Sequence, residues 1–195
     1  MRLDPKNKMG TKASVGGERA SPKKWYDGRM ITVLIRVSHG PEALVMTLSS
    51  LVPAVADGLV GDAVIIAPAH DDATSAVADA SGATLVVSDD LSWRHGAGMA
   101  RKDWILCLDD GDIPQEGWIR VLDRFITLGA RDRYLGRLRR SGGIVRRASN
   151  AARTLFCASG VRAGDLVHAR ALLDEVKIRH PVRLSASVER DPAFG

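Results

Sequence analysis

The feature that most constrains the fold of this chain is a regular alternation of short apolar runs with longer segments of helical spacing. The four apolar runs are MITVLIRV (30–37), AVIIA (63–67), ATLVVS (83–88) and WILCL (104–108). Continuous runs of this length are typical of strands buried on both faces, as in a parallel sheet. The order therefore predicts an α/β fold with a Rossmann-like, doubly wound and mostly parallel sheet.

Helical spacing fills the gaps between these runs. Gly40 and Pro41 open the first helix, in which apolar residues recur on one face: Leu44, Leu48, Leu51 and Val55. A second, short helix is predicted over 74–80, with Asp71 or Asp72 as its N-cap.

Two more helices follow, and then a less regular last third. Residues 91–101 are predicted to be helical despite two glycines. Residues 114–129 form the next predicted helix, with Pro114 in its first turn and Gly129 at its end. Beyond them we expect an exposed strand over 133–140, a helical stripe over 144–155, a strand over 165–170 leading into a short helix, and an edge strand over 182–188.

Length and cysteine content narrow the class of protein. With 195 residues and 45% apolar content, the chain is long enough for one domain with a substantial core. We expect a disordered basic tail over 1–29 and a single domain over 30–195. Two cysteines, Cys107 and Cys157, define no disulfide framework, which predicts a reducing, cytoplasmic location. No run approaches the roughly 18 apolar residues of a membrane span.

Charge is strongly polarised along the sequence. Residues 30–116 hold four basic and thirteen acidic residues, whereas 117–195 hold sixteen basic and seven acidic ones. An anionic partner of the second half, such as a phosphate, a nucleotide or an acidic membrane surface, would explain this asymmetry. Electrostatic attraction between the two halves explains it equally well.

The main candidate site follows the fourth apolar run, where Asp109, Asp110 and Asp112 stand close together. Carboxylates crowded at the end of a strand repel one another unless a cation or polar ligand compensates them. Asp112 together with Asp109 or Asp110 could bind a divalent cation that bridges a diphosphate. The alternative is an ordinary acidic loop with Asp112 as a helix N-cap.

Other candidates lie in loops expected at the same end of the sheet. Ser38 and His39 follow the first run and could contact an anionic ligand, although a hydrogen-bonded turn histidine explains His39 as well. His70-Asp71-Asp72 could serve a ligand or cap a helix, and Asp165 is a candidate base. The glycine spacing after the first run does not match a nicotinamide-binding loop, and no G-x-S-x-G nucleophile elbow occurs.

An arginine-rich stretch marks the second half of the chain. Its members are Arg131, Arg133, Arg137, Arg139, Arg140, Arg146, Arg147 and Arg153. A solvated basic face is one explanation. A nucleic-acid surface is disfavoured because Tyr134 is the only aromatic residue nearby. An anionic membrane surface is the more attractive partner, because the apolar stripe over 144–155 accompanies the arginines, and it would place the protein at the inner face of the membrane.

The order of segments resembles glycosyltransferase family 2. ITVLIRVSHGPEALVMTLSSLVPAVADGLVGDAVIIAPAHDDATSAVADASGATLVVS (31–88) is similar to the family's opening segments, and WRHGAGMARKDWILCLDDGDIPQEGWIRVLDRFI (93–126) resembles the segment that carries its D-X-D motif. The resemblance covers about residues 30–128. It implies a GT-A fold and the transfer of a sugar from a nucleotide-diphospho-sugar to an acceptor hydroxyl, assisted by Mg²⁺ or Mn²⁺.

The resemblance also implies a set of site residues. Asp109 and Asp112 would bind the metal ion. Asp165 would act as the base, on a weak similarity of its segment to the acceptor-side segment of the family. The donor would be bound by residues from four segments: His39, Asp72, Arg94, Gly96 and Asp109.

Three positions depart from the family's pattern. Ala67 stands where the second-strand turn has its first Asp, Gly111 replaces the second Asp of the D-X-D motif, and Arg94-His95-Gly96 replaces Asn-x-Gly. We therefore expect a divergent transferase, with reduced activity as one outcome. The alternatives are a non-catalytic GT-A-fold binding or regulatory protein that uses its arginine-rich face, and a nucleotide-binding protein of other chemistry.

Overall fold

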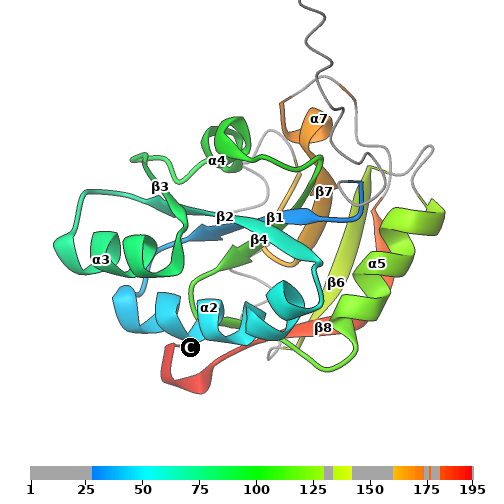
Figure 1. The fold of residues 1–195 in the computed structure, drawn as a ribbon, viewed down its shortest axis with the longest axis horizontal. Helices are drawn as coiled ribbons and strands as arrows, with labels where there is room; N and C mark the ends of the chain where they lie inside the picture. Colours follow the sequence, from blue (N-terminus) through cyan, green and yellow to red (C-terminus); the bar gives the residue numbers. More distant parts are fainter. Residues whose placement is uncertain (1–27, 130–133, 142–159, 174–175, 177–180, 195) are drawn as a thin grey trace, which may run out of the picture.

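The computed structural model describes residues 28–129, 134–141, 160–173, 176 and 181–194 (Figure 1). In chain order its elements are β1 (Ile31–Arg36), α2 (Pro41–Ala56), β2 (Val60–Ala67), α3 (Asp72–Ser81), β3 (Thr84–Val87), α4 (Trp93–Met99), β4 (Trp104–Asp109), β5 (Asp112–Pro114), α5 (Trp118–Gly129), β6 (Leu135–Ser141), β7 (Asp165–His168), α7 (Ala169–Leu172), β8 (Val182–Arg190) and a 3-10 turn, η1 (Pro192–Phe194). The alternation predicted for the first half is confirmed.

The strands form one eight-stranded sheet in the order β3-β2-β1-β4-β7-β6-β8-β5. The first four are parallel to one another, as predicted from their continuous apolar runs. The second half is mixed, because β7 is antiparallel to both β4 and β6, and β5 is antiparallel to β8. The chain runs from β1 through β2 to β3 on one side and then returns to β4 on the other side of β1.

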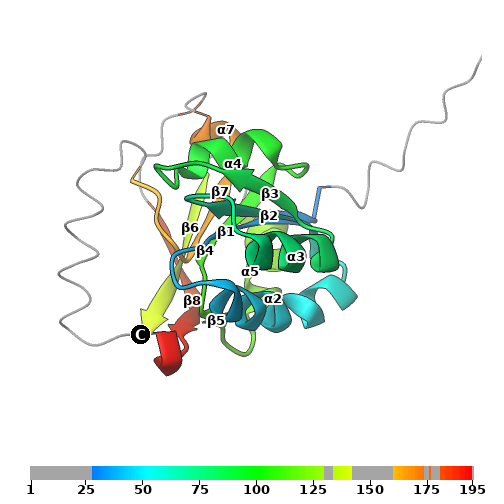
Figure 2. The ribbon, with the colours of Figure 1, turned by 90° about the vertical axis from the view of Figure 1, so that its left-hand side faces the viewer.

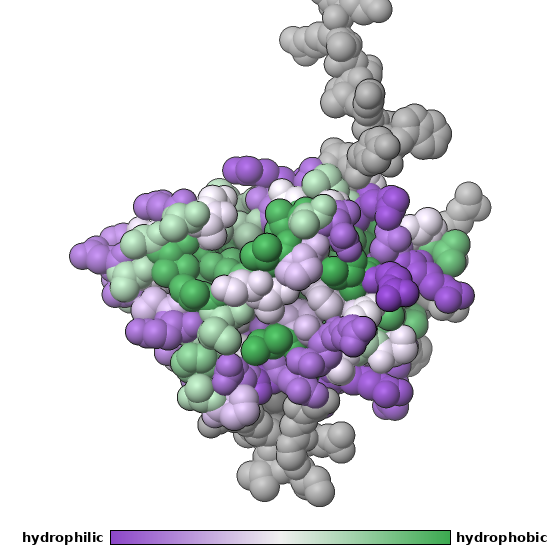
Figure 3. Space-filling model, turned by 60° about the horizontal axis from the view of Figure 1, so that its bottom comes forward, coloured by the Kyte–Doolittle hydropathy of each residue, from purple (hydrophilic) through white to green (hydrophobic). Residues whose placement is uncertain are grey.

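Helices cover both faces of this sheet (Figures 1 and 2). Helices α2, α3 and α5 lie on one face, where Leu44, Leu51 and Leu122 share a core cluster with Ile31, Val33 and Ile35 of β1. Helices α4 and α7 lie on the other, where Trp93 and Leu172 share a cluster with Leu34 and Ile66. Helix α2 also exposes apolar residues, Val45, Met46, Val52 and Val55, on a surface that mixes apolar and hydrophilic side chains (Figure 3).

The connection between β4 and β5 imposes a strong curl on the sheet. Strand β4 is fourth in the order and β5 is last, which for a flat sheet would separate them by about 19 Å. Only Asp110 and Gly111 join them, and three Cα–Cα steps span at most about 11 Å. The second half of the sheet therefore turns back over the end of β4. This brings β6 and β8 toward residues 109–112, which we call the acidic loop.

The structure contradicts two predictions for this region, the helix opened by Pro114 and the edge strand over 182–188, and one alternative, the N-cap role of Asp112. Pro114 ends strand β5 rather than opening a helix, and α5 begins later, at Trp118. Asp112 is not a helix N-cap, because it lies in β5 opposite Arg190 of β8. Because β5 pairs with β8 and is last in the strand order, β5 and not β8 is the edge strand. Strand β8 lies far from β5 in the sequence.

Candidate functional site

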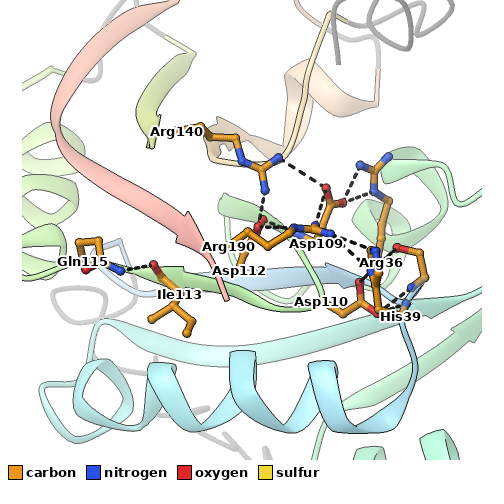
Figure 4. Close-up of polar contacts among 10 residues, drawn as sticks. Arg36, His39, Asp109, Asp110, Asp112, Ile113, Gln115, Arg140 and Arg190 are labelled. Carbon is orange, nitrogen blue, oxygen red and sulfur yellow. Dashed lines mark hydrogen bonds and ion pairs between the residues drawn. The ribbon is translucent and has the colours of Figure 1, made fainter. Parts of the chain in front are cut away.

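The candidate site lies at the carboxyl ends of β1 and β4. These neighbouring strands form the point at which the strand order reverses, and their last residues, Arg36 and Asp109, are partners in the register. In open α/β sheets, ligands bind outside the strand ends at such a switch point. The residues that gather there come from β1, the loop after β1, the acidic loop, β6 and β8 (Figure 4).

Asp110, which follows β4, binds the loop after β1 through hydrogen bonds. Its carboxylate is fully buried and accepts hydrogen bonds from the backbone N–H groups of Ser38 and His39 at 2.8 and 2.5 Å. Ser38 Oγ and His39 Nδ1 lie 3.1 and 2.9 Å from its other oxygen. Because Nδ1 faces a carboxylate, we assign the proton of His39 to Nδ1, and Nε2 then accepts from Arg190 Nη1 at 3.2 Å.

Asp109 and Asp112 bind arginines instead. Oδ1 of Asp109 accepts hydrogen bonds from Arg36 Nε and Nη2 at 2.9 and 2.7 Å, and Oδ2 lies 3.6 Å from Arg140 Nη1 and 3.5 Å from Arg190 Nη2. Oδ1 of Asp112 accepts from Arg140 Nη2 and lies 3.6 Å from Arg190 Nε. Its Oδ2 accepts from the N–H of Asp109 at 2.9 Å. Each carboxylate oxygen thus already has a donor or a cation beside it.

Three arginines and two aspartates form a cluster of ion pairs here, beside a third carboxylate, Asp110, which binds His39. We call Arg36, Arg140, Arg190, Asp109 and Asp112 the arginine cluster; three guanidinium groups face two carboxylates in it. Asp112 has no exposed surface, and burial raises the pKa of its carboxyl although Arg140 opposes the rise. The arginine side chains remain 15 to 27% exposed. The three guanidinium groups and Asp109 are therefore partly exposed to solvent, and Asp112 lies beneath them.

An aromatic ring supports one of these arginines. The guanidinium carbon of Arg36 lies 4.0 Å from the centre of the Trp93 ring, within the range of a cation–π contact. The indole Nε1 of Trp93 is buried and has no hydrogen-bond partner among the residues that the structure describes. Arg36 is thereby fixed from two sides, by Asp109 and by Trp93.

The predicted metal site, Asp109 with Asp112, fits this arrangement poorly. A dication and a guanidinium about 4 Å apart repel by about 8 kcal/mol at an effective dielectric constant of about 20. A cation bound by these carboxylates would have to displace Arg140 and Arg190. Within the described ranges, no three His, Cys, Asp or Glu side chains are grouped so that they could hold a metal ion. Metal binding by Asp109 and Asp112 is thus a prediction that these contacts do not favour.

Gly111 explains why the loop lacks the second Asp of a D-X-D motif. Its φ of 80° lies in the left-handed region, which residues other than Gly adopt only with backbone strain. A Cβ at this position would lie 3.2 Å from Cβ of Phe194 in the C-terminal turn. The backbone around Gly111 is also engaged, because its N–H donates to Ala43 O and its carbonyl accepts from Asp191 N.

The other predicted donor residues belong to helices α3 and α4. Asp72 begins α3, is fully exposed, and lies 3.6 Å from His70. Its neighbour Asp71 is the N-cap of that helix. Arg94 is exposed at the start of α4, and Gly96 is buried in the same helix. A Cβ on Gly96 would lie 2.7 Å from Ile66 Cδ1, so the contacts of Gly96 are packing contacts. Donor binding by these residues remains a prediction.

Asp165, the candidate base, is held in a second ion pair. Arg137 donates to its two oxygens at 2.7 Å each, and the N–H of Arg162 donates at 3.0 Å. Its side chain has no exposed surface. Burial raises the pKa of Asp165 against the attraction of Arg137. These contacts favour a structural role, and general-base activity of Asp165 stays a prediction.

The arginine-rich stretch divides between the inside and the outside of the described chain. Arg137 and Arg140 point inward to Asp165 and Asp112 instead of forming a solvated face, whereas Arg139 between them is exposed. The other arginines of the stretch, and the apolar stripe over 144–155, lie outside the described residues. In the part of the chain that is described, none of the helices has the length and apolar character needed to cross a membrane.

Sequence reasoning did not assign Arg36, Arg140 and Arg190 to one site. Arg36 ends a predicted strand and Arg140 lies in the arginine-rich stretch, so both had a visible signal. Arg190 had none, because its place depends on the pairing of β8 with β5 and β6.

Comparison with known proteins identifies the fold. No protein-family model matches the chain, and no curated protein sequence matches it. Among solved structures, glucosyl-3-phosphoglycerate synthase from Mycobacterium tuberculosis in complex with phosphoglyceric acid superposes with a TM-score of 0.55 and 17% identity, over 80% of this chain and 69% of that one. The chain has the GT-A fold.

Two further structures agree with this assignment. The same synthase in complex with Mn²⁺, uridine-diphosphate and glucosyl-3-phosphoglycerate gives a TM-score of 0.54 and 19% identity, over 85% of this chain and 74% of that one. Mannosyl-3-phosphoglycerate synthase from Rubrobacter xylanophilus gives 0.53 and 12%, over 73% of this chain and 55% of that one. The predicted Rossmann-like, mostly parallel GT-A fold is confirmed.

Proposed function

We propose that this protein is a GT-A-type glycosyltransferase that binds a nucleotide-diphospho-sugar and transfers its sugar to an acceptor hydroxyl. The observation that carries the proposal is the arginine cluster at the switch point between β1 and β4. A partly exposed group of three arginines is suited to a diphosphate. It occupies the place in the sheet where α/β folds bind their ligands.

The cluster also suits the chemistry of sugar transfer. The acceptor oxygen forms a bond to the anomeric carbon, and the bond from that carbon to the diphosphate breaks, so its electron pair passes to the terminal phosphate. The hydroxyl proton passes to a base or to solvent. Guanidinium groups held in place before the reaction stabilise the charge that develops on the leaving diphosphate. Arg36 is held most firmly, between Asp109 and Trp93.

Relatives in fold suggest which ligands to test first. The Mycobacterium tuberculosis synthase was solved with uridine-diphosphate-glucose and phosphoglyceric acid. We include uridine-diphosphate-glucose among the donors, and phosphoglycerate among the acceptors, as candidates for this chain. A cytoplasmic location and contact with the inner membrane surface remain predictions.

A second function is a non-catalytic GT-A-fold protein that binds a nucleotide-sugar without transferring the sugar. The observation that favours it is the burial of Asp165, whose two oxygens are occupied by Arg137 and Arg162. To accept a proton from an acceptor hydroxyl, this carboxylate would first have to release one of these donors. The two functions share the ligand but differ in turnover.

Thermal unfolding with a panel of nucleoside-diphosphate sugars tests binding. A ligand present at about a hundred times its Kd should stabilise the protein by about 2.7 kcal/mol, and so raise Tm by about 5 °C or more. Release of nucleoside diphosphate in the presence of candidate acceptors would then separate the transferase from the binding protein. If no member of the panel raises Tm, with or without Mn²⁺, both functions are contradicted.

A further inference from the structure

We propose that the diphosphate of the donor is bound by Arg140 and Arg190 without a divalent cation, these guanidinium groups taking the place of the metal ion. The inference rests on the proposed function, because it specifies how the same ligand is held. Asp109 and Asp112, the predicted metal ligands, both contact Arg140 and Arg190 where a metal ion would have to bind.

The two arginines retain donors for a ligand. Each guanidinium has five N–H groups. Among the described residues, Arg140 donates a hydrogen bond to Asp112 and lies at an ion-pair distance of 3.6 Å from Asp109. Arg190 approaches both carboxylates at 3.5 and 3.6 Å and donates to His39. Both side chains are partly exposed, so an anion can reach the remaining N–H groups.

The carboxylates act as positioning residues for these arginines. Asp112 is fully buried and receives the N–H of Asp109, so its side chain is fixed before any ligand arrives. Arg140 comes from β6 and Arg190 from β8, and Asp112 lies between them. Guanidinium groups held in this way lose little conformational entropy when they bind a phosphate, which favours affinity.

The geometry of Gly111 disfavours the usual arrangement, in which two carboxylates of a D-X-D motif bind a metal ion. The position at which a D-X-D motif has its second carboxylate has a φ of 80° and lies against Phe194. Asp110, the adjacent carboxylate, is turned to Ser38 and His39 and is fully buried. The loop therefore presents no pair of exposed carboxylates to a cation.

The test is calorimetric titration of the full chain with uridine diphosphate, or with whichever nucleoside diphosphate the panel selects, in excess EDTA and in millimolar Mn²⁺. We expect the Kd in EDTA to stay within about threefold of the Kd in Mn²⁺, since the arginines supply the positive charge. Mn²⁺ alone should leave Tm unchanged.

Variants show whether these arginines bind the ligand. Arg140→Met should weaken binding in EDTA by at least about tenfold, as expected for loss of a charge-assisted hydrogen bond. Asp112→Asn/Arg140→Met removes both partners of the buried pair and provides the same measurement if the single variant does not fold. Arg139→Met, the matched control, removes an exposed arginine from the same strand and should leave Kd unchanged.

The outcomes separate the two proposals. Binding in EDTA that depends on Arg140 supports the inference. Binding that appears only with Mn²⁺, or that is unaffected in both Arg140 variants, overturns it and leaves the proposed function standing. Absence of binding under both conditions overturns the inference together with the proposed function.

Discussion

Asp110 shows how a single buried carboxylate can determine the shape of a site. It was predicted as a possible metal ligand, yet its two oxygens are occupied by the N–H groups and side chains of Ser38 and His39. Its own N–H donates to Arg36 O, which joins the ends of β1 and β4. The residue therefore places the loop after β1 beside the arginine cluster.

Replacement of Asp110 by Ala should lower the free energy of unfolding by about 2–4 kcal/mol, because two backbone N–H groups lose a charged acceptor in a buried place. Urea unfolding measures the change. Asp89→Ala, which removes an exposed carboxylate after β3, is the control and should change the free energy by no more than about 0.5 kcal/mol. Equal values for the two variants would show that Asp110 does not hold the loop.

Individual elements were predictable where local pattern decides them. The strands and helices from β1 to β4 follow from apolar runs, a Pro at the start of α2 and the spacing of its leucines. Strand β5 was not predictable, because Asp112–Pro114 is a strand only through its pairing with β8. The site divides in the same way: Asp109 and Asp112 were expected at the end of β4, but their arginine partners depend on distant strands.

Helix α4 offers a test of packing with its own control. Gly96 is buried, and a Cβ there would lie 2.7 Å from Ile66 Cδ1 and 3.2 Å from Leu34 Cδ1, both fully buried side chains. Gly96→Ala should destabilise the protein by about 1–2 kcal/mol through overpacking. Gly98 has nothing within 4 Å of such a Cβ. Gly98→Ala should stabilise it by up to about 1 kcal/mol through reduced chain entropy.

Thermal or urea unfolding of the two α4 variants gives the comparison directly. The expected result is a change of opposite sign for the same substitution two residues apart. If Gly96→Ala stabilised the protein as much as Gly98→Ala, the close packing of α4 on β1 and β2 would be contradicted.

The molecule as a whole is an acidic half joined to a basic half. Residues 30–116 contribute Asp109 and Asp112, and the later residues contribute Arg140 and Arg190, which pair with them. The polarised sequence thus has a structural explanation in contacts across the sheet, in addition to the proposed anionic ligand.

The burial of Asp112 predicts how stability depends on pH. Because burial raises its pKa in the folded protein above the ordinary 3.8, the folded state binds this proton more tightly than the unfolded state. The contribution of protonated Asp112 to the free energy of unfolding is fully present below pH 3.8 and is lost as the pH rises through the raised pKa. Asp112→Asn lacks this titration.

Urea unfolding of both proteins between about pH 4 and about pH 7 provides the test. The free energy of unfolding of the wild type, minus that of Asp112→Asn, should fall as pH rises. A difference that grew with pH would mean that Arg140 and Arg190 lower the pKa of Asp112 by more than burial raises it.

The assembly of the arginine cluster from distant parts of the chain determines when during folding the cluster can form. The arginine cluster joins Arg36, near the start of the described chain, to Arg190, near its end, with Asp109, Asp112 and Arg140 between them. Contacts so distant in sequence are costly in chain entropy and form only when the last strands dock. A partly folded chain, or a nascent one that still lacks β8, therefore has no complete arginine cluster, and the proposed affinity for a diphosphate would belong to the finished molecule alone.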